Sequence, residues 1–157
     1  STFTLMTTRK NIFFSLSVIA FFLFSACDSN KKVSSPDQRA YFVVGEGGGF
    51  AGSYEQYRIN QDGLIEVYNF KEKNYSTVAQ VKSKEVNSFF ESITDLNLAE
   101  IELRSPGNMS QYMEITYENM KDHKLVWEKS KNSVSPGLQA LFDASFAFCK
   151  DQLAPSD

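Results

Sequence analysis

Residues 53–71 read SYEQYRINQDGLIEVYNFK, and this stretch decides the fold class. Residues 53–60 have the mixed composition of a strand, and Leu64–Lys71 alternates apolar with polar residues. Between them, Asn60-Gln61-Asp62-Gly63 is a strong turn signal, because Asn suits the first turn position and Gly tolerates positive φ at the last. The stretch therefore predicts a β-hairpin closed by a type I turn.

Further strands are expected on both sides of this hairpin. Tyr41–Val44 is aromatic and β-branched, which favours a strand, and Tyr75–Lys82 is expected to add another. Alternating residues 111–118 and 123–129, separated by a polar turn at 119–122, predict a second hairpin.

Two amphipathic helices are predicted after the strands. The first begins at Ser83 as N-cap, with Glu85 in its first turn. The second begins at Pro136, because proline fits the first turn of a helix. Their apolar stripes are Val86, Phe89, Phe90 and Ile93 in the first helix, and Leu138, Leu141, Phe142, Phe146 and Cys149 in the second.

This order predicts a small α+β domain over residues 41–150, with two helices packed on one face of an antiparallel sheet built from two hairpins. The expected element order is β-β-β-(β)-α-β-β-α, followed by a disordered tail at 151–157.

The segment Arg9–Cys27 has the layout of a secretory signal peptide. Arg9 and Lys10 are positive, residues 12–24 are apolar except for two serines, and small residues precede Cys27. A membrane span needs about 20 apolar residues, and this run is shorter. A signal without lipid is the alternative, and it would leave Cys27 able to pair with Cys149.

Phe24-Ser25-Ala26-Cys27 resembles the lipobox of bacterial lipoproteins. The resemblance implies that residues 1–26 are removed and that Cys27 carries a diacylglycerol and an N-acyl chain in the bilayer of the cell envelope. Met6 is the expected natural start, with residues 1–5 upstream of it. Residues 28–40 are polar and predict a flexible tether spanning roughly 20 Å. The choice between inner and outer membrane stays open.

The charge of the processed chain excludes one class of partner. The whole chain has a net charge of −3, and removal of Arg9 and Lys10 brings it to −5. An acidic domain with scattered lysines argues against nucleic acid as a partner.

Residues 47–52, GGGFAG, formally match the dinucleotide motif G-x-G-x-x-G, but a predicted strand follows instead of the required helix. One interpretation is structural: the glycines provide positive φ or close backbone approach, and Phe50 is a core anchor. The other is functional, with a loop that presents Phe50 to a partner.

The run Gly48-Gly49-Phe50-Ala51-Gly52, together with the expected order of hairpins and helices, resembles emfourin, a family of small bacterial inhibitors of thermolysin-like metalloproteases. The resemblance spans roughly residues 41–148 and implies that these five residues contact a protease. The emfourin family lacks the signal and tether of this chain.

Candidate catalytic groups are few, so no catalytic residue, metal site or cofactor is expected. His123 is the only histidine and lies at a predicted solvated turn. Glu100 and Glu102 would share a face if their segment were extended, but a pair of catalytic carboxylates needs a larger cleft than this domain can build. Cys149 lies on the apolar stripe of the second helix, where a buried, unreactive thiol is expected. Three functions remain: a protein-binding domain that includes protease inhibition, a structural or assembly lipoprotein, and a carrier with an apolar cavity lined by Tyr112, Trp127 and Phe142.

Overall fold

The hairpin predicted at residues 53–71 forms in the computed structural model, which describes residues 40–50, 52–116, 122–129 and 134–153. Its second strand ends at Asn69 instead of Lys71, because residues 70–73 form the next turn. Strands β2 (Ser53–Asn60) and β3 (Leu64–Asn69) pair antiparallel. Gly63 has φ 91°, and its N–H donates to the Asn60 carbonyl oxygen at 2.9 Å. The signal segment, Cys27, the tether up to residue 39, Ala51 and residues 154–157 lie outside the described residues.

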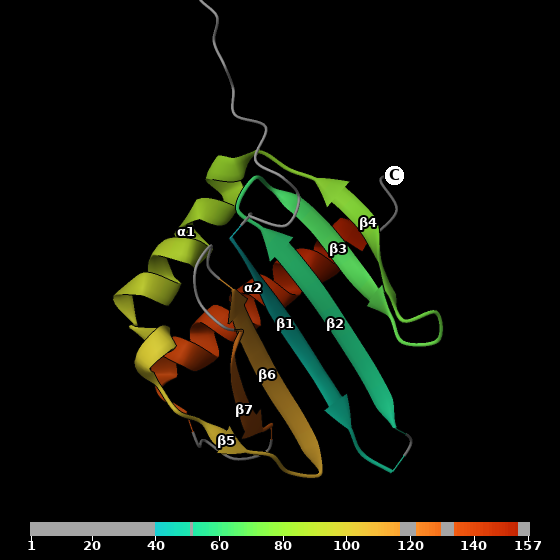
Figure 1. Ribbon diagram of the computed structural model, residues 1–157, viewed down its shortest axis with the longest axis vertical. Helices are drawn as coiled ribbons and strands as arrows, with labels where there is room; N and C mark the ends of the chain where they lie inside the picture. Colours follow the sequence, from blue (N-terminus) through green and yellow to red (C-terminus); the bar gives the residue numbers. More distant parts are fainter. Residues whose placement is uncertain (1–39, 51, 117–121, 130–133, 154–157) are drawn as a thin grey trace, which may run out of the picture. The chain divides into compact units, whose positions relative to one another are not determined.

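The strands form one seven-stranded sheet in the order β4-β3-β2-β1-β6-β7-β5 (Figure 1). The bounds of the other strands are β1 (Tyr41–Gly48), β4 (Asn74–Gln80), β5 (Arg104–Ser105), β6 (Met109–Thr116) and β7 (His123–Glu128).

The α+β class is confirmed, but the expected sheet of two antiparallel hairpins is wrong in two details. Strand β1 pairs antiparallel with both β2 and β6, so the two hairpins become halves of one sheet. Residues 104–105 pair parallel to β7, which makes the sheet mixed instead of purely antiparallel. Both pairings are long-range in sequence, and local patterns do not encode them.

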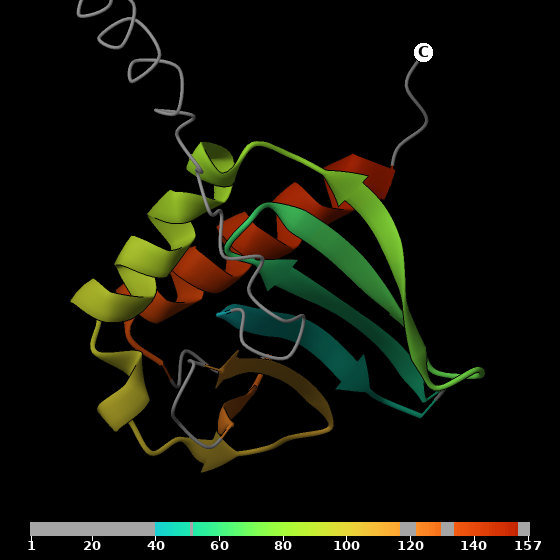
Figure 2. The ribbon, with the colours of Figure 1, turned by 45° about the horizontal axis from the view of Figure 1, so that its top comes forward.

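Helices α1 (Ser83–Asp95) and α2 (Pro136–Leu153) cover the same face of the sheet (Figures 1 and 2). The predicted N-cap is displaced by one residue, because the N-cap is Lys82, whose backbone N–H donates to the Glu85 carboxylate at 3.1 Å. Helix α2 extends to Leu153, so residues 151–153 are helical instead of belonging to a disordered tail. A short 3-10 helix, η3 (Leu98–Glu100), follows α1.

The core lies between this face and the helices. The ring of Phe42 meets Phe89 and Phe90 of α1 edge to face, with centroids 6.3 and 5.1 Å apart. On α2, Phe146 meets Tyr57 at 5.4 Å, and Phe142 meets Trp127 at 5.4 Å. The fully buried side chains of the strands that share this core include Phe42, Val44, Tyr57, Ile59, Ile65, Met113, Leu125 and Trp127.

The opposite face of the sheet, called the open face below, has no helix over it within the described residues (Figure 2). Strand alternation places Tyr41, Tyr54, Arg58, Glu66 and Tyr112 on it, because their strand neighbours Phe42, Tyr57, Ile65 and Met113 are buried in the core.

Candidate binding surface

The glycine-rich stretch forms the turn between β1 and β2. Gly48, Gly49 and Gly52 have φ of 120°, 72° and 60°, a region that L-residues other than glycine seldom adopt. The N–H of Gly52 donates to the Gly49 carbonyl oxygen at 3.1 Å, and the N–H of Gly49 donates to the Asn108 carbonyl oxygen at 2.7 Å. The structural role predicted for these glycines is therefore correct.

Phe50 is fully exposed on this turn. The interpretation of Phe50 as a core anchor is wrong. Phe50 lies in the turn at the end of the hairpin, where its ring does not contact the core. Tyr54 and Phe70 are also exposed, by 55% and 41%, and their ring centroids lie 5.5 Å apart. Phe70 is the first residue of the turn between β3 and β4, and this turn lies at the same end of the sheet as the β1–β2 turn (Figure 1). The three rings give this end an aromatic surface.

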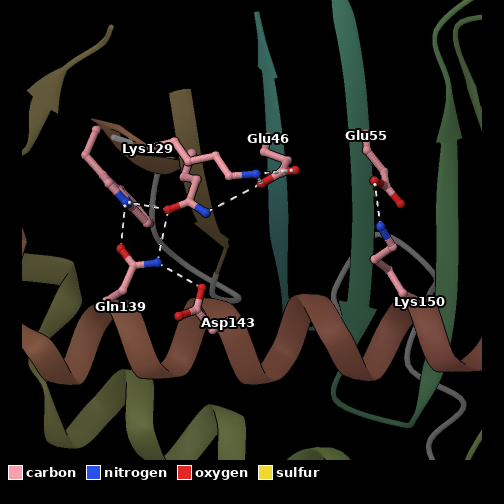
Figure 3. Close-up of polar contacts among 8 residues, drawn as sticks. Glu46, Glu55, Lys129, Gln139, Asp143 and Lys150 are labelled. Atoms are coloured by element: carbon pink, nitrogen blue, oxygen red, sulfur yellow. Dashed lines mark hydrogen bonds and ion pairs between the residues drawn. The ribbon is translucent and has the colours of Figure 1, made fainter. Parts of the chain in front are cut away.

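Two ion pairs hold the strands just below the β1–β2 turn (Figure 3). Glu46 and Glu55 are direct cross-strand neighbours, and like charges in such positions repel. Each carboxylate has its own lysine: Lys129 Nζ lies 2.7 Å from Glu46, and Lys150 Nζ lies 3.4 Å from Glu55. Tyr57 donates its hydroxyl to Glu55, and burial raises the pKa of Tyr57 so that the phenol keeps its proton.

A chain of amides continues this network toward the core (Figure 3). The indole N–H of Trp127 donates to Gln111 Oε1 at 3.0 Å and to Gln139 Oε1 at 3.2 Å. Gln139 Nε2 donates to Gln111 Oε1 at 3.0 Å and to Asp143 at 2.9 Å. Gln111 Nε2 in turn reaches Glu46 at 3.5 Å. The network ties β1, β6 and β7 to the first turns of α2.

Two further glycines of β1 lie under tyrosine rings, a role that the sequence reasoning missed. A Cβ built at Gly45 would lie 2.3 Å from Cζ of Tyr112, and one at Gly47 would lie 2.1 Å from Cδ1 of Tyr54. Gly45 is paired with Tyr112 and Gly47 with Tyr54, so each ring covers the glycine opposite it. Such cross-strand pairs pin the register of glycine-containing strands.

On the open face, Arg58 lies over the rings of Tyr41 and Tyr75, another feature that the sequence reasoning missed. Its guanidinium forms two hydrogen bonds with Glu66, at 2.7 and 2.9 Å, and lies 4.0 Å from the ring centroid of Tyr75. The hydrogen bonds that Arg58 donates to the Glu66 carboxylate raise the pKa of Arg58, whereas burial raises the pKa of Tyr75. Gln56 links Tyr112, whose hydroxyl donates to it at 2.7 Å, with Tyr75. The alternation of polar and aromatic residues in β2 was the sequence signal that could have identified this cluster on the open face.

The candidate catalytic groups are spread over the fold. His123 is half-buried instead of solvated, and its Nε2 lies 2.8 Å from the Ile101 carbonyl oxygen. Glu100 belongs to η3, so Glu100 and Glu102 do not share a strand face. Cys149 is buried as predicted, and burial raises the pKa of its thiol to about 12, which makes it a poor nucleophile at neutral pH. No group of three or more His, Cys, Asp and Glu side chains among the described residues could hold a metal ion.

The cavity predicted for a carrier does not form from its three proposed residues. Trp127 and Phe142 are buried against each other in the core, whereas Tyr112 lies on the open face. The sheet itself separates them, because successive side chains of a strand point to opposite faces.

No protein-family model matches the sequence, and no curated protein matches it either. In the part of the chain that the structure describes, no helix is both long and apolar enough to span a membrane.

Proposed function

We propose that this chain is a membrane-anchored bacterial lipoprotein with a non-catalytic domain that binds another protein through its β1–β2 turn. The observation that carries the proposal is the full exposure of Phe50 at the end of a turn whose base is held by two ion pairs. An aromatic side chain that enters a partner's pocket is a common source of binding energy.

The contacts at the base of the turn support this function. Lys129 and Lys150 hold the two strands that enter and leave the turn, and the Gly49–Asn108 hydrogen bond holds its first residue. Binding by a preorganised loop loses less conformational entropy than binding by a loop that must become ordered. The contacts at the base of the turn therefore lower the entropy that the flanking strands would lose on binding.

The position of the turn also fits an anchor at Cys27. A tether that enters the domain at Ala40 lies next to the first residue of β1. The β1–β2 turn begins after the last residue of β1, and the eight residues of the strand separate the two points by roughly 23 Å. An anchored domain would therefore keep Phe50 available to a partner.

Protease inhibition is the more specific form of this proposal. Gly48, Gly49, Phe50, Ala51 and Gly52 carry the resemblance to emfourin, and an inhibitor needs such a segment to be reachable. The exposure of Phe50 favours this function over a structural or assembly lipoprotein, which could bury the loop. A small-ligand carrier has less support, since Tyr112 and Trp127 lie on opposite faces of the sheet.

Replacing Cys27 by alanine is expected to abolish lipid attachment and release the chain from the membrane, because the thioether to diacylglycerol cannot form. Metabolic labelling with a radioactive or alkyne-tagged fatty acid, followed by membrane fractionation, measures the effect. Cys149→Ala is the matched control, since its thiol is buried and should leave labelling unchanged. Equal labelling of the Cys27→Ala chain and the wild type would exclude the lipoprotein.

Replacing Phe50 by alanine is expected to weaken capture of the partner at least tenfold, because truncation of a central aromatic residue costs about 2 kcal/mol or more of binding energy. The residue 41–157 domain serves as bait in a pull-down, and a thermolysin-type protease assay tests inhibition directly. Leu153→Ala is the matched control, because Leu153 is 48% exposed but lies at the end of α2. An unchanged set of captured proteins with Phe50→Ala would overturn the role of the turn, and full protease activity with the wild-type domain would exclude inhibition.

A further inference from the structure

The described part of the chain begins beside a groove. Ala40 is its first residue, and the Gln61 N–H donates to the Ala40 carbonyl oxygen at 3.0 Å. A groove of about 540 Å³ lies at this point, and Ala40 and Gln61 line it together with residues of α1 that include Phe90, Glu91 and Asp95. The hydrogen bond therefore fixes the end of the tether at the lining of the groove.

The α1 side of the groove carries two negative charges in unfavourable positions. Glu91 and Asp95 are four residues apart on the helix, a spacing at which like charges are destabilising. Asp95 ends α1, where the helix dipole favours a positive charge, but the last turn has no basic residue. Both side chains are exposed, and no basic side chain among the described residues forms an ion pair with either. The groove is thus suited to a cation.

We propose that Arg39, which lies outside the described residues, docks in this groove with its guanidinium among the carboxylates of Asp62, Glu91 and Asp95. Arg39 is bonded to Ala40, so its side chain starts one residue away from the groove. Asp62 follows Gln61 in the β2–β3 turn and supplies a carboxylate from that side.

An arginine fits the lining of the groove better than a small cation does. Its aliphatic stem can lie along apolar surface such as the half-buried ring of Phe90, while the guanidinium offers five N–H donors to the carboxylates. Lys31 and Lys32, the other basic residues of the tether, are further from Ala40 in the sequence. Bringing either lysine to the groove would close a longer loop, which costs more entropy. Charge and chain length therefore both favour Arg39.

The docking goes beyond the proposed function and does not depend on it, since neither a lipid at Cys27 nor a partner at Phe50 takes part. In an anchored chain it would fix the direction in which the tether leaves the domain. That exit lies at the first residue of β1, and the β1–β2 turn follows the last residue. The docking would therefore direct Phe50 away from the anchor.

NMR relaxation of the arginine Nε–H groups tests the docking in the full chain in detergent micelles, because the chain has only four arginines. Arg58 is the ordered reference, since it donates two hydrogen bonds to Glu66. Arg104 is the mobile reference, since it is exposed and forms no ion pair with a carboxylate of the described residues. The order parameter of Arg39 should lie close to that of Arg58. An Arg39 side chain as mobile as that of Arg104 would overturn the proposal.

Neutralising the three carboxylates should release Arg39 to the mobility of Arg104. The groove variant combines Asp62→Asn, Glu91→Gln and Asp95→Asn. An amide oxygen at position 62 can still accept the hydrogen bond from the Leu64 N–H, so the turn is kept. The control removes three exposed carboxylates that do not line the groove, with Glu72→Gln, Glu100→Gln and Glu102→Gln. Equal mobility of Arg39 in the two variants would contradict the docking.

A thermodynamic cycle keeps the test independent of NMR. Arg39→Gln should lower the melting temperature of the full chain by about 1–4 °C, because an exposed ion pair contributes little stability. In the groove variant the same substitution should leave the melting temperature unchanged, since no carboxylate remains for Arg39 to pair with. Far-UV circular dichroism melts measure both shifts. Equal shifts in the two backgrounds would show that Arg39 does not interact with these carboxylates.

Discussion

Replacing Trp127 by alanine is expected to lower the free energy of unfolding by about 4 kcal/mol, because truncation of a buried tryptophan costs about 3–5 kcal/mol. Trp127 is the largest fully buried side chain, and its ring meets Phe142 edge to face at 5.4 Å. The loss is large against the 5–15 kcal/mol that stabilise an ordinary domain. Urea denaturation followed by far-UV circular dichroism measures it, since the variant lacks the only tryptophan.

Trp127→Phe separates the packing contribution of the indole from its hydrogen bonds. The phenyl ring can keep the contact with Phe142, but it has no N–H for Gln111 and Gln139. Because those two amides still bond to each other, we expect a loss of only about 1–2 kcal/mol. A loss below 1 kcal/mol for Trp127→Ala would show that the core does not depend on this side chain.

Local signals in the sequence predict the local parts of this fold. The Asn60–Gly63 turn fixes a hairpin because the residue types required by the turn stand at the right positions. The apolar stripes of α1 and α2 predict their buried sides, and Val86, Ile93 and Leu138 are indeed buried. These features depend on residues a few positions apart, and a single chain displays them directly.

The position of β1 in the middle of the sheet could not be predicted from such local signals. Its glycine-rich half, Gly45–Gly48, lacks the β-branched residues that mark strands, so the sequence predicts a strand only for residues 41–44. Tyr112 and Tyr54 supply the missing side-chain cover from the neighbouring strands. Such compensation lies in the pairing of distant segments, and β-propensity depends on those neighbours.

In the candidate site, the β1–β2 turn could be predicted from the sequence, but the ion pairs that hold its base could not. The motif Gly48–Gly52 identifies the turn, and glycine chemistry explains its backbone. The ion pairs of Glu46 and Glu55 join residues 83 and 95 positions apart in the chain, a relation that one sequence does not display. Tyr54 and Phe70 become one exposed cluster only because β2 and β3 bring them together.

Replacing Gly48 by alanine is expected to lower the free energy of unfolding by about 2–4 kcal/mol and to loosen the β1–β2 turn. A Cβ at this position would lie 2.4 Å from the Asn108 carbonyl oxygen, and φ is 120°, so the variant combines a backbone clash with a strained conformation. Because the chain must move away from Asn108, the hydrogen bond from the Gly49 N–H should break. Hydrogen exchange of the Gly49 amide by NMR should accelerate accordingly.

Gly52→Ala is the matched control at the other end of the same turn. It has φ 60°, but a Cβ there would meet nothing within 4 Å, so the expected loss is only about 1 kcal/mol from the left-handed conformation. The Gly49 amide should stay protected in this variant, because the contact with Asn108 is untouched. Equal losses of stability at Gly48 and Gly52 would mean that backbone conformation alone requires the glycines. A larger loss at Gly48, together with faster exchange at Gly49, would show that the approach of Asn108 holds the turn and thereby fixes where Phe50 is presented.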